Sequence, residues 1–251
     1  MPQRTVTKSK KSGQSPLKYI LKGKQMNKDQ KNEKQISTAV IRRLPRYFRY
    51  LRELIRNNIM RISSKDLAEK MDVTASLIRQ DLNCFGGFGQ QGYGYNVKYL
   101  YNEISNILGV DRNYSAIIIG MGNLGRALAN NPLFEKRNVR IKGLFDVAPN
   151  VIGTKVGELT VMDMNDVSAF CRENKIDIAV LTLPKLEAPE AAKLLAKAGI
   201  RGFWNFSNME LSLPEYNVKI ENIHLGDTLM TLCYELAKED SERENQNGDA
   251  I

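Results

Sequence analysis

Apolar side chains recur at three- and four-residue steps from residue 36 onward, which is the period of an amphipathic helix. Arginines fill many of the polar positions between residues 42 and 56. Pro45 has no backbone N–H and suits the first turn of a helix. We therefore expect a short helix before Pro45 and a longer one over residues 45–57.

Two further short helices are expected after this segment, joined by a tight turn. Ser63 is a typical N-cap for a helix over residues 65–71, with Asp66 in its first turn. Thr74 can cap the next helix, over residues 75–84. Two short helices across a tight turn, behind a longer helix, form the helix-turn-helix arrangement.

Helical spacing divides the last of these helices into an inner and an outer face. The inner face is expected to hold Leu77, Ile78, Leu82 and Phe85, and the outer face Ser76, Arg79, Gln80 and Asn83. Arginine can pair with guanine and glutamine with adenine in a DNA major groove. The outer face therefore predicts base contacts, with a merely solvated face as the alternative.

A glycine-aromatic segment follows over residues 85–95. Its glycines adopt positive φ without strain, so it predicts a tight β-hairpin. Behind a DNA-reading helix such a hairpin is a wing, whose tip near Gln90 and Gln91 can enter the minor groove. The alternative is a strap that only packs against the domain. An amphipathic helix over residues 97–108 closes this domain near residue 110.

Strands and helices alternate in the second half of the chain. The expected strands span residues 115–120, 139–145, 156–161, 176–183, 202–206 and 218–223. The expected helices span residues 123–130, 167–174, 188–198 and 224–238. Repeated β-α units with apolar strands predict an α/β fold, a Rossmann domain whose parallel sheet is covered on both faces.

A glycine signature follows the first of these strands. It consists of Gly120, Met121, Gly122, Asn123, Leu124 and Gly125. This pattern brings backbone N–H groups to a pyrophosphate at a helix N-terminus, and Asp146 ends the next strand, where a carboxylate accepts hydrogen bonds from an adenosine ribose. Thr182, Pro184 and Asn205 lie at other strand ends and are expected to bind the cofactor as well. Pro184 and Asn205 are candidates to line the nicotinamide half of a dinucleotide, or simply end their strands.

The net charge of +9 is unevenly distributed. Residues 1–36 hold ten basic and two acidic side chains, residues 37–85 ten and five, and the remaining residues 17 and 21. A basic front joined to a mildly acidic rear indicates that only the front meets a polyanion such as DNA. Residues 1–36 hold few large apolar side chains, so we expect a disordered arm that attracts nucleic acid weakly or has no specific role.

Other function classes find less support in the sequence. No apolar run approaches the roughly 20 residues that span a bilayer, and three scattered cysteines fit a reducing cytoplasm. No metal-ligand cluster is present. A dehydrogenase needs a proton-exchanging group; His224 is the only histidine, and we attribute the Tyr234–Lys238 spacing to helix periodicity. Cys84 is either an oxidisable thiol or a small buried residue.

Three motifs together resemble the Rex family of redox-sensing transcriptional repressors. They are Arg43-Leu-Pro-Arg-Tyr-Phe-Arg-Tyr-Leu, Ile78-Arg-Gln-Asp-Leu-Asn-Cys-Phe-Gly and Gly120-Met-Gly-Asn-Leu-Gly-Arg-Ala-Leu. The resemblance covers residues 37–238. It implies a homodimer that binds operator DNA when NADH is scarce and releases it when NADH binds. The rival interpretations are an NAD-dependent dehydrogenase with a basic localising domain and a CoA- or nucleotide-binding regulator.

Composition, residue patterns and the resemblance together predict a division of the chain. We expect a disordered basic arm over residues 1–36, a winged-helix DNA-binding domain over 37–110, an NAD(H)-binding Rossmann domain over 111–222, a swapped dimerisation helix over 223–240 and a disordered tail over 241–251. The terminal helix is apolar on more than one face, so it must dock on its own sheet or on a partner subunit.

The expected DNA-binding residues are Arg43, Arg46 and Arg49 on the first helix, Ser64, Ser76, Arg79, Gln80 and Asn83 on the helix-turn-helix, and Gln91 at the wing tip. Gln80 stands where many members of the family carry Lys or Arg. Asn131 and His224 stand where some members carry a tyrosine and an aspartate, which form a switch with the arginine that matches Arg49. Arg49, Asn131, His224 and Leu225 are therefore the expected switch and dimer residues.

Overall fold

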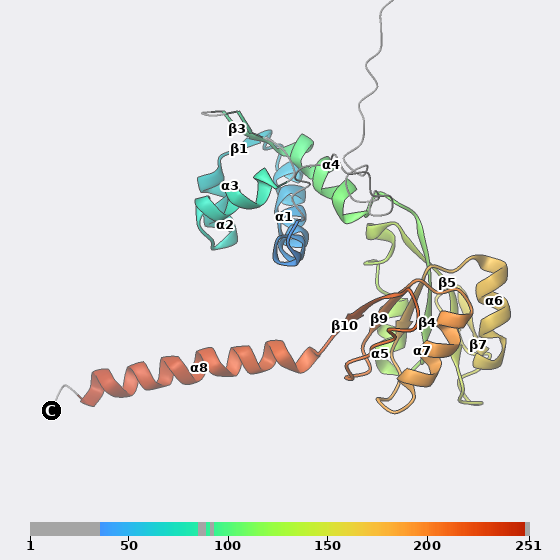
Figure 1. Ribbon diagram of the computed structural model, residues 1–251. Coiled ribbons are helices and arrows are strands. Elements are labelled where there is room, and N and C mark those ends of the chain that lie inside the picture. The colour runs from blue at the N-terminus through green and yellow to red at the C-terminus, as the bar shows by residue number, and fades with distance from the viewer. Residues whose placement is uncertain (1–35, 85–88, 91–92, 249–251) are drawn as a thin grey trace, which may run out of the picture. The chain divides into compact units, whose positions relative to one another are not determined.

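The computed structural model describes residues 36–84, 89–90 and 93–248. The chain divides into two compact units, Met1–Asp111 and Arg112–Ile251, whose helices and strands are labelled in Figure 1. Among the helices of these described ranges, none is both long and apolar enough to cross a membrane.

The first unit is a winged helix. Its described helices are α1 Thr38–Arg56, α2 Ser64–Met71, α3 Ala75–Asn83 and α4 Val97–Leu108. Its small antiparallel sheet has the order β1-β3-β2, with β1 Arg61–Ile62, β2 Gly89–Gln90 and β3 Gly94–Asn96. The pairing of β2 with β3 confirms the hairpin that the glycine-aromatic segment predicts.

The first helix, α1, runs through Pro45 without a break, so the prediction of a separate short helix before Pro45 is wrong. One side of α1 buries Leu44, Tyr47, Phe48 and Leu51. Full burial of a large apolar side chain contributes about 1.5–3 kcal/mol, whereas an interior proline costs about 3 kcal/mol. Packing of this apolar side therefore outweighs the local cost of Pro45.

Both helices of the helix-turn-helix begin at their expected caps. The Ser63 Oγ accepts a hydrogen bond of 3.0 Å from the Asp66 N–H. The Thr74 Oγ1 accepts one of 3.2 Å from the Leu77 N–H. Between them Asp72 ends α2 in the left-handed conformation, with φ 48°. Aspartate tolerates this conformation, so the tight turn forms without a glycine.

The second unit is a seven-stranded sheet in the order β10-β9-β8-β4-β5-β7-β6. Its strands are β4 Tyr114–Ile119, β5 Val139–Asp146, β6 Lys155–Val156, β7 Leu159–Asp163, β8 Ile178–Leu181, β9 Gly202–Asn205 and β10 Lys219–Asn222. Its helices are α5 Asn123–Ala129, α6 Val167–Asn174, α7 Ala188–Lys197 and α8 Leu225–Gly248, with 3-10 turns at Glu135–Arg137 and Met164–Asp166. Only the β6–β7 pair is antiparallel.

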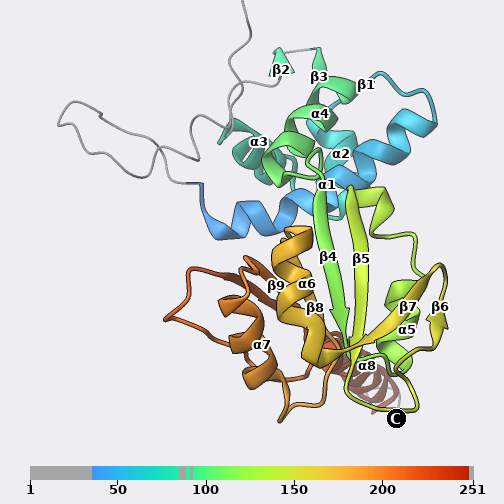
Figure 2. The same ribbon diagram turned by 90° about the vertical axis from the view of Figure 1, so that its right-hand side faces the viewer.

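Helices cover both faces of this sheet, with α6 and α7 on one face and α5 on the other (Figure 2). Alternate side chains of β4 enter the two cores: Ile117 and Ile119 pack on the α6–α7 side and Ile118 on the α5 side. The chain order reverses between β4 and β8. Sheets of this kind bind ligands at the carboxyl ends of the strands beside such a reversal.

An aromatic group lies on the α5 face of the sheet. Trp204 of β9 packs edge-on against Phe206, with 4.7 Å between ring centroids, and against Phe134 at 6.0 Å. Aromatic pairs favour this geometry because the positive ring edge meets a negative ring face.

Two segments differ from the sequence prediction. The single strand expected over residues 156–161 is a pair, β6 and β7, because Gly157 turns the chain at φ 61°. The disordered tail expected from residue 241 is also wrong up to Gly248, since α8 continues that far. An ion pair of 2.6 Å between Arg243 and Glu239, one helical turn apart, supports this extension. Residues 249–251 lie outside the described part.

Candidate dinucleotide site and nucleic-acid interface

At two of the three glycines in the turn after β4, there is no space for a side chain larger than a hydrogen atom. At Gly120, where φ is +92°, an added Cβ would lie 2.8 Å from the Thr182 carbonyl oxygen. At Gly125 an added Cβ would lie 2.0 Å from the Gly120 carbonyl oxygen. The first glycine therefore permits the tight turn, and the last lets α5 pack directly on it.

The middle glycine has the opposite surroundings. No atom lies within 4 Å of a Cβ added to Gly122, which is the N-cap residue of α5. Gly122 therefore borders open space at the carboxyl end of β4. These three roles, a tight turn, an open approach and close helix packing, are those of the glycines in a dinucleotide-binding turn.

Asp146 ends β5 beside this turn. Its Oδ2 accepts a hydrogen bond of 2.5 Å from the Met121 N–H, and its Oδ1 accepts one of 2.9 Å from the Ala148 N–H. Arg126 of α5 supports the same turn, since its Nε donates to the Met121 carbonyl oxygen at 3.0 Å and its Nη2 to the Thr154 Oγ1 at 3.2 Å. The sequence reasoning assigned no role to Arg126.

Thr182, at the end of β8, holds the turn from the other side. Its hydroxyl is the donor to two carbonyl oxygens, that of Gly120 at 2.6 Å and that of Ile119 at 3.0 Å. Pro184 is exposed in the following loop. The Thr182 side chain is therefore committed to the protein, whereas Pro184 remains accessible.

Asn205 is 1% exposed, so its side chain does not line an accessible site in this chain. Its Nδ2 donates to the Met209 carbonyl oxygen and to Asn222 Oδ1, each at 2.8 Å, and its Oδ1 accepts from the Ser207 N–H at 3.1 Å. The expectation of a nicotinamide-lining side chain is corrected accordingly, because a fully paired buried amide organises its own loop.

The outer face of α3 is exposed as the helical period predicts. Its exposed side chains are Ser76, Arg79, Gln80 and Asn83. The Arg79 Nη1 donates to the Ser64 Oγ at 3.0 Å, which joins α3 to the start of α2. On the inner face Leu77 is only half-buried, and Phe85 lies outside the described residues.

An acidic residue that the sequence reasoning did not single out completes the inner face of α3. Asp81 is 1% exposed and binds Arg43 of α1 through two contacts of 2.7 Å. Its position three residues after Ile78 and next to Leu82 was the available signal, since this spacing places it on the buried face. The Nε and Nη2 of Arg43 therefore point to α3.

The other arginines of α1 differ in exposure. Arg49 is exposed, with its guanidinium carbon 6.0 Å from the ring centroid of Tyr50, and Arg46 is half-buried. Gln91, the expected wing tip, lies outside the described residues. Arg61 at the base of the wing donates to the Tyr93 carbonyl oxygen at 3.2 Å.

The expected switch residues of the second unit make local contacts. The Asn131 Oδ1 accepts from the Leu133 N–H at 2.9 Å. His224, just before α8, lies 3.0 Å from Glu210 between Nε2 and Oε2. Hydrogen bonds from His224 and then Asn222 hold the pKa of Glu210 below its usual value. A histidine and a glutamate thus meet where the chain enters α8.

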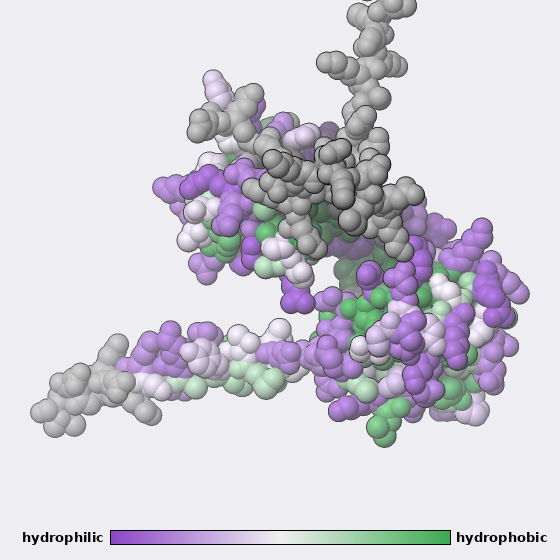
Figure 3. All heavy atoms as spheres, viewed as in Figure 1, coloured by the Kyte–Doolittle hydropathy of each residue, from purple (hydrophilic) through white to green (hydrophobic). Residues whose placement is uncertain are grey.

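Residues 225–243 of α8 are exposed, including the apolar ones. These are Leu225, Leu229, Met230, Leu232, Tyr234 and Leu236, which expose 52–65% of their surface. Green atoms lie along one side of this helix in Figure 3. Tyr234 and Lys238 are exposed on the same helix. Within the described ranges, no group of three or more His, Cys, Asp and Glu could hold a metal.

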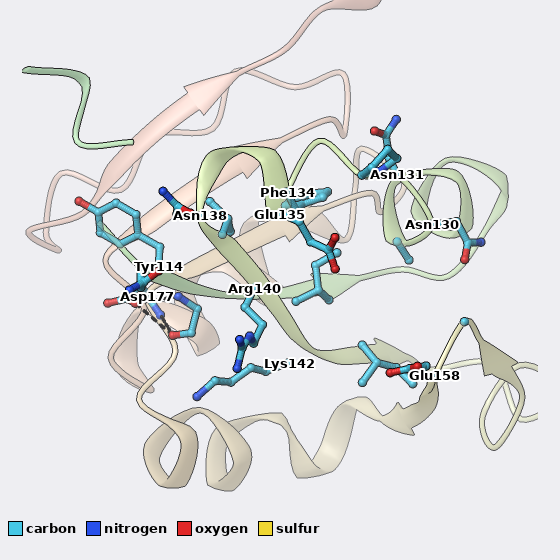
Figure 4. Close-up of a pocket in the computed structure, with 18 of the residues that line it drawn as sticks. Tyr114, Asn130, Asn131, Phe134, Glu135, Asn138, Arg140, Lys142, Glu158 and Asp177 are labelled. Atoms are coloured by element: carbon cyan, nitrogen blue, oxygen red, sulfur yellow. Dashed lines mark hydrogen bonds between the residues drawn. The ribbon is translucent and has the colours of Figure 1, made fainter. Parts of the chain in front are cut away.

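A broad groove of about 1150 Å³ opens at the other, amino end of the sheet (Figure 4). It is lined by side chains of both charges, among them Arg140, Lys142, Glu135 and Glu158. Burial would raise the pKa of Asp177 at its edge, but hydrogen bonds from Ser115 and Arg201 hold it below its usual value. This groove lies at the amino ends of the strands, the wrong ends for a dinucleotide.

Comparison with known proteins decides the family. A family model described as "Putative DNA-binding protein N-terminus" matches residues 35–83, and one described as "CoA binding domain" matches residues 111–209. The redox-sensing transcriptional repressor Rex of Thermoanaerobacter pseudethanolicus is 54% identical over 206 residues, covering 82% of this chain and 92% of that repressor. The chain belongs to the Rex family. A Rex repressor of Clostridium botulinum is 50% identical over 203 residues, covering 81% and 96%.

Solved structures of a Rex-family repressor, RSP, share the fold. RSP in complex with β-NAD+ and operator DNA has a TM-score of 0.77 and 52% identity, covering 86% of this chain and 99% of RSP. RSP in complex with β-NADH has a TM-score of 0.77 and 50% identity, covering 85% and 99%. The predicted α/β architecture behind an N-terminal winged helix is thereby confirmed. The Rex relatives are regulators by name, so the chain belongs to a family of repressors and not of dehydrogenases.

Proposed function

We propose that this protein is an NADH-responsive transcriptional repressor, which binds double-stranded operator DNA as a homodimer and releases it when NADH binds. The observation that carries the proposal is the pairing, in one chain, of a dinucleotide-type glycine turn beside Asp146 with a winged helix that exposes Arg79. A Rex-family relative has been crystallised with each of the proposed ligands.

The cofactor is assigned to the carboxyl ends of β4, β5 and β8. In this assignment, backbone groups of Gly120, Met121, Gly122, Asn123, Leu124 and Gly125 hold the pyrophosphate, Asp146 holds the adenosine ribose, and Pro184 borders the nicotinamide. Thr182, Asn205 and Arg126 support these contacts from behind, because their polar atoms already bind the protein.

DNA is assigned to the outer face of the helix-turn-helix. Ser64, Ser76, Arg79, Gln80 and Asn83 face the major groove, Arg46 and Arg49 the phosphates, and Gln91 the minor groove. Phosphate contacts set position and affinity, whereas base contacts give specificity. The basic arm over residues 1–36 adds attraction without sequence preference. A repressor works where the DNA is, so we place the protein in the cytoplasm.

The dimer is assigned to α8, which corresponds to the dimerisation helix expected over residues 223–240. A row of exposed leucines, including Leu225 and Leu229, is unusual for an isolated helix and marks a surface that a partner covers. The proposed switch draws residues from both units: His224 and Asn131 come from the second unit and Arg49 from the DNA-binding unit. The domains proposed here keep the expected boundaries at residues 37, 110 and 222.

Sensing follows from the charge of the nicotinamide ring. The oxidised ring is cationic and the reduced ring neutral, so an apolar pocket favours NADH because burying a charge is costly. If NADH binds one dimer shape better than the other, it shifts the population to the shape that releases DNA. The coupling is reciprocal, so DNA weakens NADH binding by the same factor.

A titration tests this function. The full-length protein is first used to select duplexes from a random DNA library, and the selected duplex is then bound and titrated with NADH, NAD+ or CoA. Release at far lower NADH than NAD+, and none with CoA, is the expected result. Equal responses to NADH and NAD+ would contradict the sensor, and sustained NADH oxidation with small carbonyl compounds would favour a dehydrogenase.

A further inference from the structure

The buried carboxylate of the DNA-reading helix has a complete set of partners on α1. Asp81 accepts from Arg43 Nε through Oδ2 and from Arg43 Nη2 through Oδ1, each at 2.7 Å. The Tyr47 hydroxyl also donates to its Oδ2 at 2.9 Å. Tyr47 is fully buried and Arg43 half-buried. These three side chains form what we name the α1–α3 network.

The partners of Asp81 keep their protons over an unusually wide pH range. The hydrogen bond to Asp81 raises the pKa of Arg43. Burial, and then the hydrogen bond to Asp81, raises the pKa of Tyr47 far above its usual value. The network therefore keeps a cation and a hydroxyl donor facing Asp81.

Stability alone is a weak reason for such a network. A buried ion pair gains little over apolar side chains of similar volume, because desolvation of the two charges offsets their attraction. Apolar packing is non-directional, whereas an arginine fork on a carboxylate fixes both distance and orientation. The network sits two residues from Arg79 and next to Gln80, the side chains that face outward on α3.

We propose that Asp81 is a positioning residue for DNA recognition: the α1–α3 network fixes α3 against α1 so that Arg79 and Gln80 meet base edges in register. The inference rests on the proposed function. It also gives Arg43 a different role from the phosphate contact that its place on the basic helix suggests. Base contacts need atoms held to a fraction of an ångström, while phosphate contacts tolerate displacement.

The test measures the ratio of affinities for the selected duplex and for an unrelated duplex of equal length, using fluorescence anisotropy with the full-length protein. Asp81→Asn keeps the shape of the side chain but removes its charge. We expect this variant to lower the affinity ratio about tenfold or more, the equivalent of one misplaced base contact. Affinity for the unrelated duplex should not fall.

A second variant separates positioning from folding. Arg43→Met, Tyr47→Phe and Asp81→Leu combined replace the ion pair and the buried hydroxyl that donates to it with apolar side chains, which such sites tolerate without loss of stability. We expect its melting temperature to match or exceed that of the wild type while the affinity ratio falls as for Asp81→Asn. Glu69→Gln is the matched control, because Glu69 is exposed on α2 and its loss removes the same charge.

Each outcome decides the proposal. If both folded variants keep the ratio within about twofold of Glu69→Gln, the usual range of a surface substitution, the proposal is overturned. If Asp81→Asn does not fold, the triple variant decides alone. If neither folds, the network serves folding and the proposal also fails. A wild-type protein that selects no duplex at all would instead refute the proposed function.

Discussion

The Asp146 carboxylate links the end of β5 to the glycine turn, because its Oδ2 accepts a hydrogen bond of 2.5 Å from the Met121 N–H. An ionised carboxylate accepts hydrogen bonds at both oxygens and has about four acceptor positions. Backbone N–H groups of Met121 and Ala148 take two of them. The others remain for the two hydroxyls of a ribose, with the carboxylate already held in place.

Asp146→Asn should therefore weaken NADH binding about 10- to 100-fold, since hydrogen bonds to a charged group contribute about 1.5–3 kcal/mol. The same change should narrow the preference for NADH over NADPH, because the charge that repels a 2′-phosphate is gone. Isothermal titration calorimetry measures both. Glu158→Gln, at the opposite end of the sheet, is the control, and an unchanged NADH affinity in Asp146→Asn would rule out the assigned ribose contact.

Gly122→Val should keep the fold and lose the cofactor. Gly122 has φ −70° and no atom within 4 Å of an added Cβ, so the folded protein accommodates a side chain there. We expect a stability loss under about 1 kcal/mol, as for a less favourable N-cap. NADH binding should be abolished and DNA should stay bound in its presence. NADH affinity equal to the wild type would show that the pyrophosphate lies elsewhere.

Gly125→Ala provides the contrast to that variant. Its Cβ would meet the Gly120 carbonyl oxygen at 2.0 Å, so α5 must move away from the turn. Overpacking of this kind costs about 1–3 kcal/mol. Thermal melting should show a clear loss in Gly125→Ala and little in Gly122→Val.

Arg49→Ala should change the salt dependence of DNA binding more than its specificity. Arg49 is exposed on α1, and each phosphate contact contributes about 0.9 to the slope of log K against log salt. Binding isotherms at several salt concentrations should show the slope falling by that amount, with the ratio of selected to unrelated DNA nearly unchanged. Lys142→Ala in the second unit is the charge-matched control, and an identical slope in both would exclude a phosphate contact at Arg49.

Cys171 should resist alkylation in the folded protein. The thiol is 3% exposed, and burial raises its pKa to about 11. A raised thiol pKa stabilises the fold below the unfolded value of about 9, and this contribution is lost as pH rises through about 11. Mass spectrometry after iodoacetamide treatment at pH 8 should find Cys171 intact in the folded protein and modified once the protein is denatured. Comparable labelling of Cys171 with and without denaturant would contradict the burial.

Leu229→Glu combined with Leu236→Glu should dissociate the dimer. Both side chains are more than half exposed on one side of α8, so their loss leaves the fold of the unit intact. Two buried leucines contribute about 1.5–3 kcal/mol each, which predicts a dimer dissociation constant at least about 100-fold higher. Analytical ultracentrifugation measures it, with Glu235→Gln as the control. A dimer of unchanged strength would place the interface away from α8.

Much of the fold follows from local signals in the sequence. Ser63 and Thr74 cap their helices because a hydroxyl before a periodic segment satisfies a free N–H. The strand before Gly120 and the roles of the three glycines follow from an apolar run that meets a glycine turn. These features depend on residues adjacent in the chain, which is why periodicity and spacing predict them.

The errors arise where distant contacts decide. Pro45 predicts the start of a helix, yet the apolar core packed against α1 keeps the helix continuous through it. Helical spacing places Asp81 on the inner face of α3, but its partner Arg43 lies 38 residues away on another helix, so the sequence alone assigns it no role. The position of Asn205 at a strand end likewise predicts a ligand contact, but its amide already donates hydrogen bonds to Asn222 and Met209. In each case the deciding partner lies on another element.

The aromatic group on the α5 face of the sheet contains the only tryptophan of the chain, Trp204. Tryptophan emits at wavelengths that a reduced nicotinamide absorbs and an oxidised one does not. Trp204 lies on β9, in the same sheet as the strand that leads into the glycine turn. Bound NADH should therefore quench its emission, which gives the unmodified protein an optical signal of its redox ligand. NADH occupancy and the release of fluorescently labelled DNA can then be followed in the same sample at two wavelengths.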